Sequence, residues 1–323
     1  MSGPATKYSI IIPTFNRRDV LVGTLESLRR MSAPPGGFEV IIVDDGSPHS
    51  LDALVAPYRE QYPLTLLQQG NAGPAAARNR GAALARGEFL AFTDDDCQPL
   101  PDWLCAYDRV LTNHPGELLG GIIVNALVSN VFSATSQLIV DLVYRQFNPT
   151  PEQATFFCSN NFVMSAARFR ELGGFDESNY RLAAGEDRDF CSRWRQRGWP
   201  MRQVNEAVIL HFHQMTMRKF WRQCFGYGRG ACTFHRLELA RGHNSLVRDS
   251  GLHLNLPRTL WPLWLQLNWK SRLASLPLLG VWQVANLCGF LYQKHLDRSH
   301  QTFARSGAAS PPADSPTDRQ TPL

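Results

Sequence analysis

The chain has 323 residues, of which 44% are hydrophobic and 19% are Asp, Glu, Lys or Arg, and its formal net charge is +5. This length and composition allow a sizeable core spread over roughly two domains, and they exclude a disordered, fibrous or repeat polypeptide. The mild positive charge suits a phosphate-bearing ligand or an anionic surface, and no motif indicates nucleic acid as a partner.

Cysteine usage and the N-terminal residues bear on the compartment. The seven cysteines are odd in number and lack C-x-x-C spacing, so they indicate neither a disulfide framework nor a zinc site. Residues 1–8 contain no apolar stretch of the kind found in a signal peptide. We therefore expect a protein of the reducing cytoplasm.

The first third of the chain alternates short β-branched runs with helical patterns, which is typical of βαβ units. This alternation predicts an α/β fold with a mostly parallel sheet flanked by helices. The predicted elements are a strand at 8–12, a helix capped by Asn16, a strand at 38–43, a helix at 51–61, a strand at 64–68, a helix at 75–85 and a strand at 88–93.

Acidic clusters follow two of these predicted strands, Asp44-Asp45-Gly46-Ser47 and Asp94-Asp95-Asp96. Open parallel sheets bind ligands beyond the carboxyl ends of their strands, although turns also favour Asp. Three adjacent carboxylates repel one another and need a cation or many hydrogen bonds. In an extended segment Asp94 and Asp96 would face the same side, which suits Mg²⁺ or Mn²⁺ with a diphosphate.

Six stretches of the chain form an ordered set of motifs. They are IIPTFNR at 11–17, VDDGS at 43–47, GPAAARNRG at 73–81, TDDD at 93–96, GGFDE at 173–177 and GED at 185–187. In order and spacing, over about residues 7–215, they resemble the family 2 inverting glycosyltransferases of the GT-A fold. The resemblance implies a Rossmann-like nucleotide-diphospho-sugar transferase.

The resemblance also implies a donor site for a nucleotide-diphosphate sugar. In it Asp45 would bond the base, Arg78 would approach the diphosphate, and Asp94 would be the ribose-side or the outer acidic residue. Gly120-Gly121 resembles the place where the backbone passes close to the donor sugar, although an ordinary turn explains these glycines equally well. The residues implied in donor binding are Pro13, Thr14, Asn16, Asp45, Arg78, Asp94 and Asp95.

The implied catalytic groups follow in the second half of this region. Asp187 matches the base that deprotonates the acceptor hydroxyl, and Glu186 would raise its basicity or bond the acceptor. Without the resemblance both acids could simply occupy the first turn of a helix, where the macrodipole favours them. Asn160 and Asn161 would border the acceptor.

A divalent cation, Mg²⁺ or Mn²⁺, is the implied cofactor. Asp96 matches the metal ligand of the family. His211 and His213 lie one residue apart after a strand-like run, so both could face one side, and the resemblance implies that one of them completes the metal shell. A structural histidine is the alternative for each.

The C-terminal third differs from the rest in composition. Between 214 and 248, seven Lys or Arg residues interleave with five aromatic residues against one acid, and 273–293 is uncharged throughout. The second stretch could lie at a membrane interface, pack in a core or an oligomer, or span about 30 Å of hydrocarbon. We expect a catalytic domain at 1–215, a basic and apolar helical region with peripheral membrane contact at 216–302, and a disordered tail at 303–323.

These patterns predict a metal-dependent inverting glycosyltransferase that moves one sugar to a glycan or lipid-linked acceptor in cell-surface glycan assembly, at the inner face of the cell membrane. A processive polysaccharide synthase is less favoured, because Gln196-Arg197-Gly198-Trp199 lacks the Gln-x-x-Arg-Trp spacing and no multi-span pattern occurs. A nucleotidyltransferase or a dinucleotide oxidoreductase would need a glycine-rich loop after the first strand, and residues 13–18 contain no glycine. An inactive sugar-nucleotide-binding scaffold is the non-enzymatic alternative.

Overall fold

The computed structural model describes residues 6–181, 184–245 and 256–306. The strands are β1 (Tyr8–Thr14), β2 (Phe38–Asp44), β3 (Leu64–Gln68), β4 (Phe89–Thr93), β5 (Cys97–Pro99), β6 (Leu118–Asn125), β7 (Asn161–Ser165) and β8 (Met201–His211). The helices are α1 (Arg18–Arg29), α2 (Asp52–Val55), α3 (Pro74–Leu84), α4 (Trp103–Leu111), α5 (Val131–Phe147), α6 (Ala166–Leu172), α7 (Glu186–Gln196), α8 (Met217–Ala240), α10 (Leu256–Trp264) and α11 (Trp269–Ser306), with 3-10 turns at Ala56–Glu60 and Pro151–Gln153.

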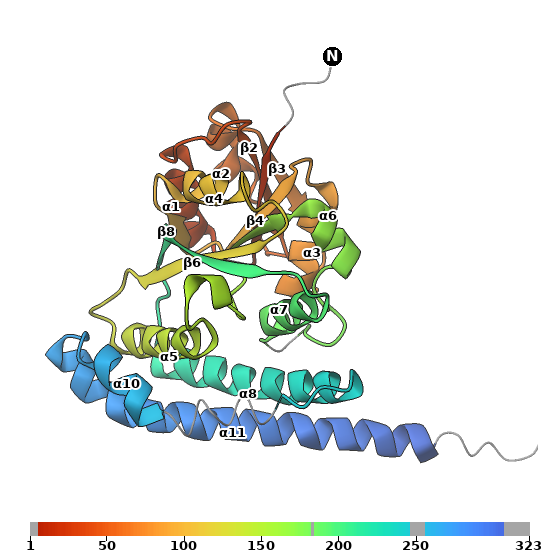
Figure 1. Ribbon diagram of the computed structural model, residues 1–323, viewed down its shortest axis with the longest axis vertical. Coiled ribbons are helices and arrows are strands. Elements are labelled where there is room, and N and C mark those ends of the chain that lie inside the picture. Colours follow the sequence, from red (N-terminus) through yellow and green to blue (C-terminus); the bar gives the residue numbers. More distant parts are fainter. Residues whose placement is uncertain (1–5, 182–183, 246–255, 307–323) are drawn as a thin grey trace, which may run out of the picture.

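One eight-stranded sheet, of order β3-β2-β1-β4-β7-β6-β8-β5, forms the centre of the molecule (Figure 1). In its first half β1 pairs in parallel with β2 and β4, and β2 with β3, as the alternating pattern predicts. In its second half β7 runs antiparallel to β4 and β6, and β5 antiparallel to β8, while β6 and β8 are parallel. The sheet is therefore parallel in one half and mixed in the other.

Side chains of the sheet alternate between two cores. Ile10 and Ile12 of β1 pack in one cluster with helices α1 and α4, whereas Ile11 packs in a second cluster with α6 and α7. This alternation follows from the two-residue repeat of a strand. Because both faces are covered, the strands appear in the sequence as nearly continuous apolar runs.

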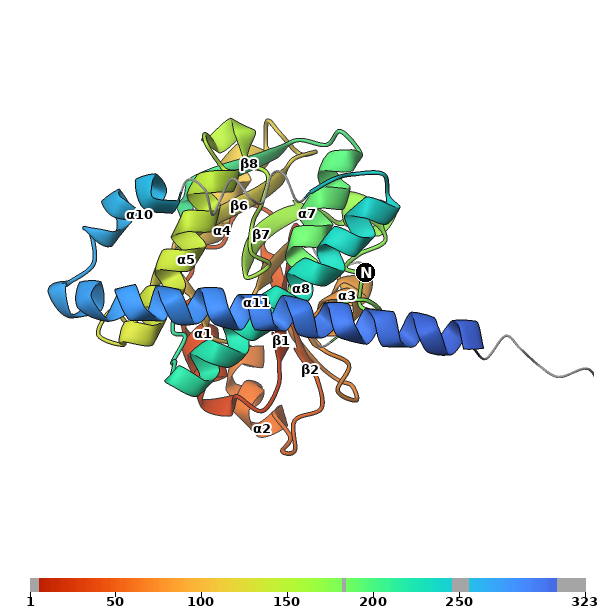
Figure 2. The ribbon, with the colours of Figure 1, turned by 90° about the horizontal axis from the view of Figure 1, so that it is seen from below.

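Helices α5, α8, α10 and α11 form a separate layer against one side of the sheet domain. Figure 1 shows α8 and α11 side by side at the edge of this layer, and Figure 2 shows α11 crossing its outer face. Gly228 of α8 lies against the backbone of Asn286, and Gly289 of α11 lies against the backbone of Phe225. A Cβ atom at either glycine would overlap the partner helix, so these positions allow the two helices their close approach.

Three local expectations are wrong. Asn16 does not cap the first helix: it has φ +53°, and the residue that precedes the helix is Arg17, which makes no side-chain cap within the described residues. Gly120 and Gly121 lie inside β6, where added Cβ atoms would meet Phe157 and the Ala207 carbonyl rather than a turn or the cavity. Helix α11 continues to Ser306, so the first residues of the predicted tail are helical, and 307–323 lie outside the described residues.

Candidate active site

A cavity of about 1250 Å³ lies between the sheet and the helical layer. Most of the residues proposed from the sequence line it. These are Pro13, Thr14, Asp45, Arg78, Asp94, Asp95, Asp96, Asn160, Glu186, Asp187, His211 and His213. The ends of β1, β2, β4 and β8 and the start of α7 therefore converge on one space, and Asn16 and Asn161 lie outside its lining.

Asp45 organises the loop that follows β3. Its two carboxylate oxygens accept hydrogen bonds from the Gln69 side chain at 2.7 Å and from the backbone N–H groups of Ala72 and Gly73 at 2.8 Å each. Gly46 beside it has φ +90°, a conformation that an L side chain rarely adopts. Asp45 of the first acidic cluster thus lines the cavity and orders the loop beside it.

The three carboxylates of 94–96 do not lie in an extended segment. The Cys97 N–H donates to the Asp94 carbonyl at 3.1 Å, so the chain turns between β4 and β5. The expected shared side of Asp94 and Asp96 is wrong for that reason. Asp94 pairs with Arg78 at 2.7 Å, whereas Asp96 pairs with Arg17 at 2.5 Å.

Asp95 lies between these two and is buried. It accepts a hydrogen bond from the Thr14 hydroxyl at 2.7 Å and pairs with Arg17 at 2.8 Å. Burial raises the pKa of Asp95 to about 7 despite the nearby guanidinium of Arg17, and the charge of Asp96 adds to the rise. Its hydrogen bond to Thr14 fixes the turn against β1.

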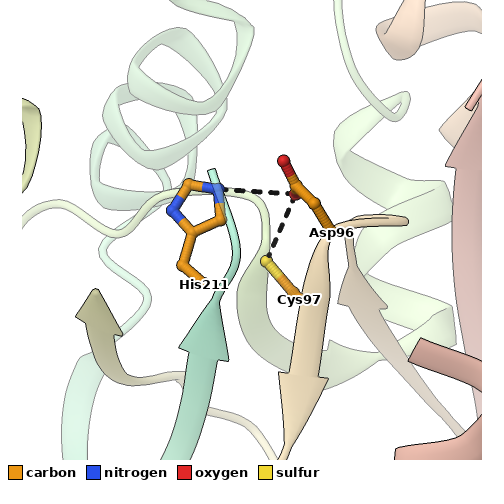
Figure 3. Close-up of side chains that lie close together, drawn as sticks. All are labelled: Asp96, Cys97 and His211. Carbon is orange, nitrogen blue, oxygen red and sulfur yellow. Dashed lines mark hydrogen bonds and ion pairs between the residues drawn. The ribbon is translucent and has the colours of Figure 1, made fainter. Parts of the chain in front are cut away.

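The pairing of β5 with β8 sets Cys97 opposite His211 and so brings the histidine to Asp96. Figure 3 shows His211, the last residue of β8, facing Asp96 in the turn before β5, with Cys97 beneath them. His211 Nε2 lies 3.4 Å from Asp96 Oδ1. The candidate ligand atoms, one each from Asp96, Cys97 and His211, all lie within 4.8 Å of one another.

The charge of Asp96 is strongly stabilised. Its burial raises the pKa, but the hydrogen bond with His211 and the charges of His211 and Arg17 outweigh burial and hold the pKa of Asp96 well below its usual range. An ionised carboxylate beside an imidazole fits a divalent cation such as Mn²⁺, which takes oxygen and nitrogen ligands. Within the described residues Asp96 and His211 therefore suit a metal ion.

His213 lies near this cluster without joining it. Its ring stacks on that of His211, with ring centroids 4.9 Å apart. Burial, reinforced by the neighbouring His211, lowers the pKa of His213 to about 4, so its ring is neutral at physiological pH. The shared side predicted for the two histidines is confirmed by this stacking.

Arg17 is a residue of the cavity that the sequence reasoning passed over. Its guanidinium bridges Asp95 and Asp96, and it comes from the loop that carries the first motif. The three adjacent acids at 94–96 were a signal for such a residue, because adjacent carboxylates need a positively charged partner. In this structure an arginine supplies that partner.

Glu186 and Asp187 open helix α7 and point into the cavity. Arg78, itself buried, bridges Glu186 at 3.0 Å and Asp94 at 2.7 Å, which ties the end of β4 to the start of α7. Burial raises the pKa of Asp187 to about 7, and the adjacent charge of Glu186 adds to the rise. A carboxyl group with such a pKa can accept a proton near neutral pH.

Helix α7 is anchored behind this pair by a buried ionic cluster. Asp189, fully buried, accepts from Arg193 at 2.7 Å and from Arg241 of the α8 C-cap at 2.7 Å. Arg236 of α8 pairs with Asp297 of α11 at 3.1 Å. Part of the basic cluster at 214–248 thus holds helices together instead of facing a ligand.

The two asparagines expected at the acceptor differ in position. Asn160 lines the cavity, and its buried Oδ1 has no hydrogen-bond partner within the described residues. Asn161 is fully buried and is bonded by Trp103 and Tyr107, while its amide donates to backbone carbonyls. The acceptor-side expectation for Asn161 is therefore wrong, because all its polar atoms serve the core.

Comparisons with solved structures identify the fold. Solved structures of similar fold include a mannosyltransferase from Pyrobaculum calidifontis in complex with GDP-Man and Mn²⁺, with TM-score 0.66 and 17% identity over 90% of this chain and 89% of that one. They also include Staphylococcus aureus TarS 1–349 in complex with UDP-GlcNAc, with TM-score 0.52 and 17% identity over 91% and 92%. The predicted GT-A fold, an α/β sheet with flanking helices and a helical C-terminal segment, is confirmed.

Curated relatives by sequence include the pre-mycofactocin glycosyltransferase of Mycobacterium tuberculosis, 30% identical over 71% of this chain and 48% of the relative. Another is the validoxylamine A glucosyltransferase of Streptomyces hygroscopicus subsp. limoneus, 27% identical over 62% and 50%. The chain spans about half the length of these relatives. The profile of glycosyl transferase family 2 matches residues 9–173, and the chain belongs to that family.

Proposed function

We propose that this chain is a metal-dependent, inverting glycosyltransferase that moves one sugar from a nucleotide-diphosphate sugar to an acceptor hydroxyl. The observation that carries the proposal is the joint lining of one cavity by the Asp96–His211 pair and by Asp187. The solved relatives bound to GDP-Man with Mn²⁺ and to UDP-GlcNAc support a nucleotide-sugar donor and a divalent ion.

Asp96 and His211 would hold the metal ion. The ion would replace the guanidinium of Arg17 as the cationic partner of Asp96. When bound, the ion supplies positive charge that stabilises the leaving diphosphate. Asp45 and the loop that it orders would contact the nucleotide, together with Pro13 and Thr14.

Arg78, Asp94 and Asp95 would complete the donor side. Arg78 would face the diphosphate. Asp94, which it pairs with, would lie at the ribose, and Asp95 would keep the turn in place through Thr14. His213, neutral and stacked on His211, is the alternative nitrogen ligand.

Asp187 would act as the base. As the acceptor oxygen attacks the anomeric carbon from the side opposite the leaving diphosphate, the carboxylate of Asp187 takes the hydroxyl proton. The raised pKa of Asp187 suits this transfer near neutral pH. The Asn160 Oδ1, which has no hydrogen-bond partner among the residues that the structure describes, would accept a hydrogen bond from the acceptor and orient it.

We also propose peripheral contact with the inner face of the cell membrane and a role in cell-surface glycan assembly. Within the described residues, the segment Trp269–Ser299 of α11 is long and apolar enough to cross a membrane. Its most apolar window has a mean hydropathy of 1.4 and is 33% buried. Its packing along α8 and α5 favours contact with a membrane surface over a span.

Calorimetric titration of UDP-, GDP- and dTDP-sugars, with and without Mn²⁺, tests the proposal. One donor should bind in a metal-dependent manner and be hydrolysed slowly, with the released sugar inverted at its anomeric carbon. Retention of configuration would overturn the inverting mechanism. Binding without turnover, even with acceptor mixtures present, would favour the inactive scaffold, and repeated addition of sugar to one product would favour a processive synthase.

A further inference from the structure

The outer face of α11 carries an apolar stripe. We define the α11 stripe as six side chains that recur every three or four residues, or every eight across Gly280, and that are 54–66% exposed: Trp269, Leu273, Leu276, Val284, Leu287 and Leu291. It runs for about 33 Å at 1.5 Å per residue. An exposed apolar surface of this length is unusual for a surface that faces only water.

The exposed charged side chains described on α11 are basic. Lys270 and Lys294 are exposed near its two ends. Asp297 is the only acid in residues 256–306, and it is paired with Arg236 at 3.1 Å. An apolar face bordered by lysines matches the headgroup region of an anionic membrane.

The cavity has an apolar wall made by the same layer of helices. We define this wall as Ile139, Val140, Val143 and Phe147 of α5 and Trp282, Val284, Leu287 and Phe290 of α11. A volume of about 1250 Å³ exceeds the roughly 300–1,000 Å³ of most ligand sites, so the cavity has room for more than the donor. A sugar or nucleotide has little to gain from eight apolar side chains, whereas an alkyl chain gains free energy for each methylene that it buries there.

Val284 and Leu287 belong to both surfaces. They line the cavity, and they are 54% and 59% exposed on the stripe. The cavity therefore opens on the face of α11 that suits a membrane. The cavity also extends to the start of α7. There α8 packs against the residues that precede this helix, since a Cβ at Gly230 would overlap the Ala184 carbonyl, two residues before Glu186.

We propose that the acceptor carries an apolar chain that binds along this wall and enters the cavity from the membrane surface at Val284 and Leu287. The inference rests on the proposed function, because it assigns the acceptor class of the same site. It selects a lipid-linked acceptor over a free glycan. The apolar chain of the acceptor lies between α5 and α11, and the polar end of the acceptor reaches Asn160 and Asp187.

A homologous series of methyl, hexyl, octyl and decyl β-glucosides, each below its micelle concentration, tests the wall without knowledge of the natural acceptor. The wild-type chain should bind them more tightly as the alkyl group lengthens, by up to about fourfold for each methylene that the wall buries. Calorimetry measures the affinities. A series with no dependence on chain length would overturn the inference.

Two aspartate variants on one helix separate the wall from the stripe. Leu287→Asp places a charge at the opening of the cavity and should flatten the chain-length series. Leu273→Asp makes the same change on the stripe, at a residue outside the cavity lining and 65% exposed, and should leave the series unchanged. Equal losses in both variants would show that the alkyl chains bind the stripe alone and would overturn the inference.

Thermal unfolding checks that Leu287→Asp still folds, which its 59% exposure favours. Donor binding by the wild-type chain is measured separately. Failure to bind any donor would overturn the proposed function, whereas donor binding together with a flat alkyl series would overturn only the acceptor class inferred from the wall.

Discussion

The carboxylate of Asp187 sets the expected pH dependence. Burial and the charge of Glu186 raise the pKa of Asp187 to about 7, and only the deprotonated form can accept a proton. The transfer rate should therefore rise with pH up to about 7, level off above it, and fall about tenfold per pH unit on the acid side. Asp187→Asn should lower kcat by about 10²–10⁴-fold with donor affinity retained.

Glu186→Gln tests whether Asp187 is the base whose pKa sets the rate profile. This change removes the like charge that raises the pKa of Asp187 and releases Arg78 from its bond to Glu186, and both effects favour the ionised Asp187. The acid limb of the rate profile should shift to lower pH. A profile that stays in place would contradict the role of Asp187.

Asp96 should control the metal dependence of donor binding. Asp96→Asn should remove the gain in donor affinity that Mn²⁺ confers. Because Asp96 would bind the ion directly, the loss of metal affinity should exceed the roughly 10–100-fold seen when a residue that only supports a metal ligand is changed. Asp102→Asn is the matched control, because this side chain is 67% exposed and lies outside the cavity lining. Calorimetry with and without Mn²⁺ measures both, and an unchanged metal effect in Asp96→Asn would move the ligand role elsewhere.

At the scale of elements, the contact between α8 and α11 depends on glycine. A Cβ at Gly228 would overlap the Asn286 backbone, so Gly228→Ala should lower the free energy of unfolding by about 1–3 kcal/mol. Gly226, two residues earlier in the same helix, has nothing within 4 Å of such a Cβ. Gly226→Ala should therefore raise the free energy of unfolding by up to about 1 kcal/mol through helix propensity.

Denaturant titration of both glycine variants measures these differences, and effects of the same sign would contradict the packing argument. Sequence patterns alone could not separate the two glycines, because both lie inside one helix. Helix α5 illustrates a signal that was available: Ile139, Val140, Val143 and Phe147 recur at helical spacing, although no helix was predicted there.

At the scale of the whole molecule, the α11 stripe predicts binding to anionic membranes. The wild-type chain should co-sediment with vesicles of phosphatidylcholine and phosphatidylglycerol, and less so at high salt. Leu276→Asp should weaken partitioning at least about tenfold, because a buried leucine contributes about 1.5–3 kcal/mol. Leu84→Asp on α3 is the control, since Leu84 is 52% exposed and Leu276 is 54% exposed. Equal binding by both variants would contradict the assignment.

The sequence by itself determined those strands and turns that are set by residues adjacent to one another in the chain. Apolar runs such as Ile10–Ile12 report strands buried on both faces, and the acidic and glycine-rich stretches after them report the turns at which a parallel sheet binds ligands. For this reason the parallel half of the sheet was predictable, and most of the site residues proposed from the sequence line the cavity. The glycosyltransferase family followed from the same stretches.

The tertiary structure alone decided which side chains meet across the sheet and between helices. The pairing of β5 with β8 brings His211 to Asp96, the loop before α1 brings Arg17 to the same carboxylate, and the core takes Asn161 from the acceptor. The packing of α11 on α5 then gives the cavity its apolar wall. Each of these contacts joins residues far apart in the chain, so no local pattern encodes it; strand register and helix packing do.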